Sequence, residues 1–219
     1  MGKKVGVVLS GCGVFDGAEI HESVITILAL DRAGAEMVFC APDREQMHVV
    51  NHHTGEVAEG ENRNVRVESA RIARGPVRNV AEVKAEELDA LIFPGGFGAA
   101  KNLCTFAVAG ADCDVDPGVA ALVREVHAQG KPIAAVCIAP ALLAKVLGSE
   151  GPNLTIGNDA GTAGAMESLG ANHVACPVTE FVVDRDRKLI TSPAYMLAGS
   201  ISEAAEGIEK TVAALMEMA

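Results

Sequence analysis

The sequence predicts an α/β fold in which a mostly parallel sheet carries helices on both faces and gains one β-hairpin. Three observations predict it. Apolar residues make up 49% of the 219 residues and aromatic residues only 3%, so the core is built from Ala, Val, Ile and Leu. Short, fully apolar runs, typical of strands buried on both faces, alternate with runs of helical periodicity. No linker, repeat or low-complexity segment separates them, and we expect residues 1–219 to form one domain.

The first elements form a βαβ unit. Residues 3–9 are typical of a buried strand, residues 18–34 of a helix that Gly34 ends, and residues 35–42 of a second strand. Four apolar residues of this helix follow helical spacing: Ile20, Val24, Ile27 and Leu28. The crossover is expected to be right-handed, which makes the two strands parallel.

The middle of the chain is less regular at first. Residues 43–87 begin as a hairpin or an extended loop and continue with weak helical character. Residues 88–96 then predict a buried strand that ends in Pro-Gly-Gly. A clear helix follows over 114–131, with Pro117 near its first turn and Gly130 at its end.

The last part repeats the alternation. A strand over 132–137 leads into a helix over 138–148. Further strands and helices follow: a strand at 153–158, a short helix at 160–171, a hairpin at 180–192 around a charged turn, and a terminal amphipathic helix at 198–219.

Charge and cysteine content restrict the partners and the compartment. The net charge of −11 argues against nucleic acid or an anionic membrane surface, because phosphate contacts require Lys and Arg. No apolar stretch has membrane-spanning length, and the N-terminus lacks the pattern of a signal peptide. The six cysteines form no C-x-x-C pair. We therefore expect free thiols and a cytoplasmic location.

A glycine-rich segment at 11–17 resembles a dinucleotide fingerprint, with Asp43 placed to bind a ribose. Asp16, Glu19 and Glu22 crowd the start of the helix that follows. Their charges would repel a pyrophosphate at that helix N-terminus. A tight turn is the better interpretation, and we expect no cofactor.

A metal site is also disfavoured. His21 and Glu22 begin an H-E-x-x-H pattern, but Ile25 stands where the second histidine is required. His52 and His53 are adjacent, yet no second cluster lies at ligand spacing. We expect no metal.

Cys137 stands at the corner between a buried strand and a helix, where fixed nucleophiles are often held. A thiol in the first turn of a helix feels the partial positive charge of the helix N-terminus, which favours the thiolate. The backbone N–H of Ile138 is then directed at an oxyanion. Gly95 and Gly96, at the end of a neighbouring strand, let the backbone supply a second donor. Both strand ends lie at the edge where open α/β sheets place their sites.

Several segments resemble the ThiJ/PfpI superfamily, which is related to class I glutamine amidotransferases. They include "LSGCGVFDGAEIHE", "NHHTGE", "PGGFGAAKNL", "CIAPA" and "TSPAYML", and the resemblance is strongest to its ElbB-like branch, the enhancing lycopene biosynthesis proteins. The resemblance spans essentially the whole chain. It implies a flavodoxin-like, doubly wound sheet and a homodimer.

The resemblance also implies roles for individual residues. Cys137 corresponds to the nucleophile and Glu22 to its acid/base partner, with the N–H groups of Gly96 and Ile138 as the oxyanion hole. Many superfamily members carry a histidine after the elbow helix, but the matching position falls near Gly157. His21 or His52 would have to reach the site from another direction. Cys12 and Asn51 are further candidates for the pocket, with Cys12 as a resolving thiol.

The ElbB-like branch implies a cofactor-independent glyoxalase that converts glyoxal to glycolate, with other small 2-oxoaldehydes as further substrates. We expect the only partners to be this small dicarbonyl substrate, in a shallow site lined with Gly and Ala, and a second copy of the chain. An activated thiolate at Cys137 would also oxidise readily. The alternative is therefore a non-enzymatic, redox-sensing regulatory protein of the same fold, with a link to isoprenoid biosynthesis. Sequence alone does not separate the two.

Overall fold

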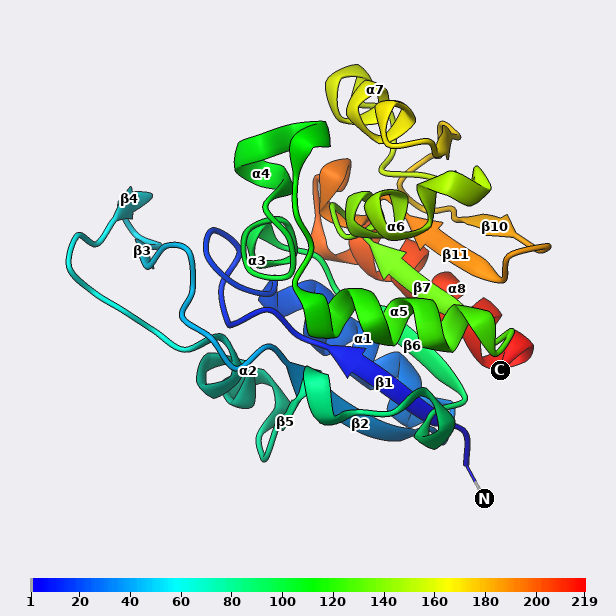
Figure 1. Cartoon of the computed structure of the whole chain (residues 1–219), viewed down its shortest axis with the longest axis horizontal. Helices are drawn as coiled ribbons and strands as arrows, with labels where there is room; N and C mark the ends of the chain where they lie inside the picture. Colours follow the sequence, from blue (N-terminus) through cyan, green and yellow to red (C-terminus); the bar gives the residue numbers. More distant parts are fainter. Residues whose placement is uncertain (1) are drawn as a thin grey trace.

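The computed structural model describes residues 2–219 and contains a central seven-stranded sheet (Figure 1). The strand order is β10-β11-β7-β6-β1-β2-β5. The strands span β1 (Lys4–Val8), β2 (Glu36–Ala41), β5 (Arg78–Asn79), β6 (Ala90–Phe93), β7 (Ile133–Val136), β10 (Val182–Asp184) and β11 (Leu189–Ser192). All neighbours are parallel except β10 and β11, which form the predicted antiparallel hairpin. The predicted α/β, flavodoxin-like architecture is confirmed.

Helices cover both faces of the sheet. On one face lie α1 (Ile20–Arg32) and α8 (Ile201–Met218), and on the other α5 (Pro117–Ala128) and α6 (Pro140–Leu147). Helix α2 (Val65–Ala73) packs against β2 near the edge. Within residues 2–219, no helix combines the length and apolar character needed to cross a membrane.

The two apolar cores explain why the central strands are apolar throughout. In β6, Ala90 and Ile92 face the α1 and α8 side, whereas Leu91 and Phe93 face the α5 and α6 side. Side chains alternate between the faces of a strand, so a strand covered on both sides has no polar position. β7 follows the same rule, with all of its residues buried.

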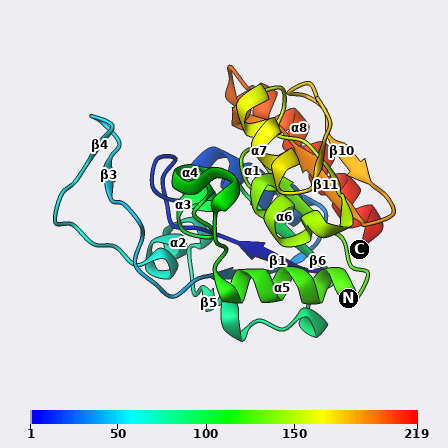
Figure 2. The same ribbon diagram turned by 45° about the horizontal axis from the view of Figure 1, so that its top comes forward.

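Smaller elements lie outside the central sheet. The hairpin of β3 (Val50–Asn51) and β4 (Glu56–Val57) projects from the body of the molecule, as Figures 1 and 2 both show. The predicted strand at 153–158 shortens to β8 (Asn153–Leu154), which pairs with β9 (Asn172–His173) in a separate two-stranded sheet. The remaining helices are α3 (Phe97–Lys101), α4 (Phe106–Ala109) and α7 (Ala160–Ser168), with 3-10 turns at Val80–Glu82, Ala85–Glu87, Gly110–Asp112, Gly148–Glu150 and Ala194–Met196.

Helix α1 turns a mixed polar and apolar face toward the sheet, from which Ile25 and Leu30 join the core, and leaves an apolar stripe exposed. Ile20 is 45% exposed and Val24 is 50% exposed, whereas Glu22 and Ser23 are buried. The Ser23 hydroxyl donates to the Glu19 carbonyl at 2.6 Å, whereas Glu22 accepts from amides outside the helix, those of Gly95 and Tyr195. The helical spacing was therefore predicted correctly, but it marks a surface of the protein and not its core.

Candidate active site

Cys137 lies in a strained turn directly after β7. Its φ is +62°, in the left-handed region that residues other than glycine rarely adopt. Its amide N donates to the Ser192 carbonyl at 3.0 Å, which ties the turn to the end of β11. The thiol is buried. Helix α6 begins only at Pro140, so Cys137 precedes the first helical turn and does not stand in it.

Glu22 is fully buried beneath this turn. Its Oε2 accepts a hydrogen bond from the Gly95 amide at 3.0 Å and its Oε1 accepts one from the Tyr195 amide at 3.1 Å. The Cys137 thiol is also hydrogen-bonded to this carboxylate. The pKa of Glu22 is raised to about 7, mainly by burial and also by the neighbouring Glu19, while these donors oppose the shift. A carboxyl titrating near neutrality is suited to act as a general base.

The same environment raises the pKa of the Cys137 thiol above its usual value. Burial is the largest cause and the Glu22 carboxylate the next, while the N–H groups of Gly96 and Ile138 act in the opposite direction. The prediction that a helix N-terminus lowers the pKa of Cys137 and favours its thiolate is therefore wrong. At rest the sulfur keeps its proton, so removal of that proton is part of any attack by Cys137.

Glycines allow the close approach of the two strand ends. A Cβ atom on Gly95 would lie 2.6 Å from Glu22 Oε2 and 3.0 Å from Cys137 Sγ, and it would also overlap Cys137 Cβ. Gly96 has a φ of +95°, which turns its amide toward the sulfur. The Pro-Gly-Gly end of β6 is thus required by both sterics and backbone conformation.

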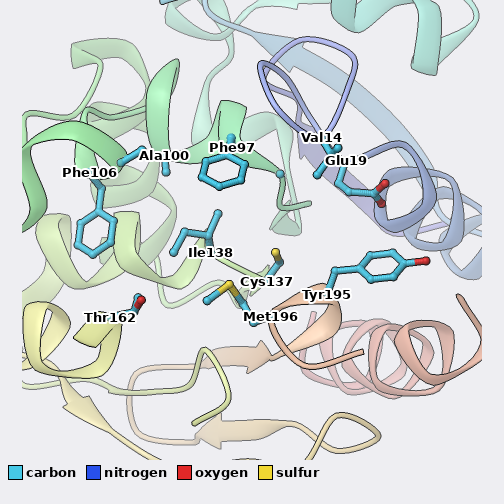
Figure 3. A pocket seen from close by; sticks show the side chains of 12 residues that line it. Val14, Glu19, Phe97, Ala100, Phe106, Cys137, Ile138, Thr162, Tyr195 and Met196 are labelled. Atoms are coloured by element: carbon cyan, nitrogen blue, oxygen red, sulfur yellow. The ribbon is translucent and has the colours of Figure 1, made fainter. Parts of the chain in front are cut away.

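A cavity of about 380 Å³ opens in front of the thiol. Figure 3 shows Cys137 between an apolar side, formed by Phe97, Phe106 and Ile138, and a polar side with Glu19 and Tyr195. Other lining residues are Val14, Gly96, Ala100, Ala107, Thr162 and Met196. The prediction of a shallow site lined with Gly and Ala is wrong, because two phenylalanines and a methionine form much of its wall.

The remaining candidates lie at the rim or elsewhere. His21 is exposed, and its Nδ1 lies 2.8 Å from the Tyr195 hydroxyl at the rim of the cavity. His52 does not line the cavity; its Nε2 accepts from the Phe15 amide at 3.2 Å. Asn51 accepts a hydrogen bond from the His53 amide. Cys12 does not line the cavity either and lies near Glu68 and Arg71, where burial and Glu68 raise the pKa of its thiol.

No histidine among residues 2–219 lines the cavity, and Gly157 packs against Leu197 instead. Within the same residues, no group of three or more His, Cys, Asp or Glu side chains is arranged to hold a metal ion. Asp43 is paired with Arg66 at 2.8 Å. Gly11 and Gly13 both have positive φ, which fits the tight-turn interpretation of the glycine-rich segment.

Sequence reasoning missed Tyr195 and the pocket role of Glu19. Tyr195 follows β11, and Ala194 before it has a φ of +45°. This turn lies at the same sheet edge as the ends of β6 and β7. The position of "SPAY" directly after a predicted strand was the available signal. Glu19 caps α1, since its Oε2 accepts from the Glu22 amide at 2.7 Å.

The fold and this site define an α/β protein with a buried cysteine at a strand–helix turn and a carboxylate beside it. Residues 12–198 match the DJ-1/PfpI family, and the chain belongs to that family. Its relation to the glutamine amidotransferase-like proteins is also supported. The human glutamine amidotransferase-like class 1 domain-containing protein 3, mitochondrial, is 48% identical over 98% of this chain and 83% of that protein.

Two further relatives extend the comparison. The zebrafish (Danio rerio) ES1 protein, mitochondrial, is 35% identical over 88% of this chain and 76% of its own length. The crystal structure of an isoprenoid biosynthesis protein with an amidotransferase-like domain from Ehrlichia chaffeensis superposes with a TM-score of 0.92 at 37% identity, covering 99% of both chains. Drosophila melanogaster DJ-1beta shares the fold, with a TM-score of 0.59 at 24% identity over 98% of this chain and 91% of that one.

These relatives correct the predicted location. The human protein and the zebrafish protein are both named as mitochondrial, as is a rat relative at 48% identity. The cytoplasmic prediction is therefore wrong. That prediction rested on the free cysteines and on the N-terminal pattern. Free cysteines indicate a reducing environment, which is not unique to the cytoplasm.

Proposed function

We propose that this protein is a cofactor-independent glyoxalase that converts glyoxal, and other small 2-oxoaldehydes, to the corresponding hydroxy acid. The observation that carries the proposal is the buried hydrogen bond between the Cys137 thiol and the Glu22 carboxylate, at the floor of a cavity with backbone donors beside it. Membership of the DJ-1/PfpI family supports a reactive cysteine at this position.

The first step is addition of sulfur to one aldehyde carbon. Glu22 takes the thiol proton as the S–C bond forms, and the carbonyl oxygen becomes an oxyanion. The N–H groups of Gly96 and Ile138, which point at the sulfur, are placed to stabilise that charge. Protonation of the oxyanion by Glu22 gives a hemithioacetal and returns the carboxylate.

The second step moves a proton between the two carbons. The Glu22 carboxylate removes the proton of the sulfur-bearing carbon, giving an enediol, and the proton is delivered to the neighbouring carbon. The product is a thioester of glycolate on Cys137, an isomer of the hemithioacetal, so no electron leaves the substrate. Water then cleaves the thioester and Glu22 returns the proton to sulfur. Thiolate is a good leaving group, so no histidine is required.

The test follows glycolate by proton NMR, with purified protein, glyoxal and no glutathione. Wild type should form glycolate above the protein-free control, and Cys137→Ser and Glu22→Gln should each abolish the excess. Cys40→Ser is the matched control, because Cys40 is equally buried and burial raises the pKa of its thiol to about 12. Full turnover by Cys137→Ser would rule out this mechanism. No glycolate from wild type would favour the regulatory alternative.

Within the family we propose the ElbB-like branch, with a connection to isoprenoid biosynthesis. The similarity to the Ehrlichia chaffeensis protein, named for isoprenoid biosynthesis, supports this placement. Deleting the gene in its host and measuring isoprenoid products tests the connection. Unchanged product levels would argue against it.

We also propose that the chain forms a homodimer and binds neither nucleic acid nor membranes. The outward apolar stripe of α1, formed by Ile20, Val24 and Leu28, supports a protein contact because a monomer gains nothing from exposing it. Light scattering should give twice the chain mass for wild type and the single mass for Val24→Asp. A wild-type monomer would refute the dimer.

A further inference from the structure

Two cysteines outside the proposed site close the neck of a loop beside the cavity. Cys104 and Cys113 are both buried, at 3% and 0% exposed. An antiparallel bridge joins Cys104 to Val115. The Thr105 amide donates to the Asp114 carbonyl at 2.9 Å, and the Asp114 amide donates to Thr105 Oγ1 at 2.9 Å. Residues two apart on a strand point to the same side, so this pairing places both thiols on one side of the neck.

The two thiols are in contact and chemically unequal. The Cys104 thiol donates to the Ala99 carbonyl at 3.3 Å, and its interaction with Cys113 lowers the pKa of Cys113 and raises that of Cys104. The ammonium of Lys145 on α6, whose Nζ donates to the Ala111 carbonyl at 3.5 Å, also lowers the pKa of Cys113, while burial and Asp114 oppose it. A thiolate in contact with a second thiol is the arrangement from which disulfides form.

We propose that Cys104 and Cys113 form a redox-active pair that closes into an intrachain disulfide when the protein meets a hydroperoxide. The Cys113 thiolate attacks the terminal oxygen of the hydroperoxide, which gives a sulfenic acid and releases the alcohol, or water from hydrogen peroxide. Cys104 sulfur then displaces the hydroxyl group of the sulfenic acid, which leaves as water. Two thiols lose two protons and two electrons in total, and the O–O bond accepts them.

The oxidant reaches the pair when the loop between the two cysteines opens. Ala107, Val108 and Ala109 of the short helix α4 are exposed, with Val108 at 62%. A single helical turn with few buried contacts belongs to the part of a structure that opens at low cost. Opening of α4 exposes the thiols without unfolding the sheet.

The disulfide acts on the wall of the cavity. Phe106 and Ala107 line it, and both belong to the loop that the new bond closes into a ring. A ring restricts the conformations of the segment that it encloses. The inference does not rest on the proposed glyoxalase function, because neither sulfur touches the cavity and the tests below use no substrate.

Peptide mapping tests the bond directly. Trypsin cuts after Lys101 and Arg124, so one peptide, residues 102–124, contains Cys104 and Cys113 and no other cysteine. After treatment of the folded protein with dilute hydrogen peroxide and then iodoacetamide in denaturant, this peptide should be two hydrogens lighter than its reduced form and carry no alkyl group. Dithiothreitol should restore two alkylation sites. Cys40, buried without a thiol partner, is the internal control and should stay fully alkylated.

Single substitutions and hydrogen exchange complete the test. Cys104→Ser and Cys113→Ser should each abolish the light peptide. In oxidised wild type, amide exchange over 105–112 should slow by about tenfold, since the ring restricts opening of α4. The proposal is overturned if the peptide gains oxygen as sulfinic acid without losing two hydrogens, or if the bond forms only in denatured protein. Unchanged exchange would overturn the effect on the cavity wall.

Discussion

The Glu22 carboxylate lies beside the Cys137 thiol in the interior of the protein, and each group shifts the pKa of the other. The thiol's hydrogen bond favours ionised Glu22, while the carboxylate's charge keeps the sulfur protonated. The pair is joined by Gly95, whose amide donates to the carboxylate and whose missing side chain leaves room for the sulfur. Activity should therefore depend on the pair and not on a preformed thiolate.

Glu22→Gln tests the pair through the pH profile. The base form of Glu22 is required, and its pKa is raised to about 7, so the rate of wild type should rise roughly tenfold per pH unit up to about pH 7 and then level off. Gln cannot accept the proton. The variant should lose roughly 100- to 10,000-fold in kcat, and its pH profile should lack this rising limb below pH 7. The measurement is kcat for glyoxal between pH 5 and pH 9; a limb that persists in the variant would assign the titration to another group.

Glu19→Gln should move the midpoint of the same limb. Glu19 is one cause of the raised pKa of Glu22, and its side chain also caps α1 through the Glu22 amide. Gln keeps an oxygen for the cap but removes the charge, so the pKa of Glu22 falls and the limb shifts to lower pH. The variant's profile is compared with that of wild type at matched ionic strength. A shift to higher pH would contradict the assigned role of the Glu19 charge.

Gly95→Ala should inactivate the protein while leaving its fold intact. The added methyl group would overlap the Cys137 and Glu22 side chains, and a displacement of about 1 Å costs roughly 100-fold in rate. Gly164→Ala is the matched control, because a Cβ atom there meets nothing within 4 Å and alanine favours helix α7. Kinetics and thermal melts are measured on both. Near-normal activity of Gly95→Ala would show that the contact is dispensable.

Much of the fold was predictable because it depends on local patterns. The apolar runs of β6 and β7 reflect burial on both faces, and the Pro-Gly-Gly end of β6 marks a close backbone approach. The direction that α1 faces was not predictable. The stripe of Ile20, Val24 and Leu28 is exposed, because the face that packs against the sheet carries Glu22 together with Ile25 and Leu30. Burial of Glu22 depends on amides from Gly95 and Tyr195, which the helix pattern does not show.

The prediction of a lowered pKa for Cys137 was wrong for the same reason. A helix N-terminus is visible in a sequence, whereas burial and a carboxylate contributed by a distant helix are not. Tyr195 and Glu19 likewise reach the cavity only through tertiary contacts. Cys137 and Gly96 could be named from the sequence because each directly follows a strand, which is a local pattern. The ends of parallel strands then lie at the same edge of the sheet.

The buried Glu22 should also make stability depend on pH. Its pKa is raised from 4.5 to about 7 on folding, so the folded state holds the proton more tightly than the unfolded state. This contribution is fully present below pH 4.5 and is lost as pH rises through about 7, in total about 3 kcal/mol. The free energies of unfolding of wild type and Glu22→Gln are compared by urea denaturation at pH 5 and pH 8. The difference between the two proteins should change by most of that amount, with Gln gaining relative stability at pH 8; an unchanged difference would mean that Glu22 is not titrating in this range.

Asn102→Ala should destabilise the loops that frame the site. The Asn102 amide group donates to the carbonyls of Ser10 and Asp16, both at 2.8 Å, and accepts from the Met47 amide at 2.9 Å. The side chain is buried, so its loss leaves carbonyl and amide groups without a partner, at about 2–4 kcal/mol in total. Asn62→Ala, at an exposed position, is the control and should change stability by less than about 0.5 kcal/mol. Both are measured by urea denaturation, and equal stabilities for the two variants would show that Asn102 does not hold these loops together.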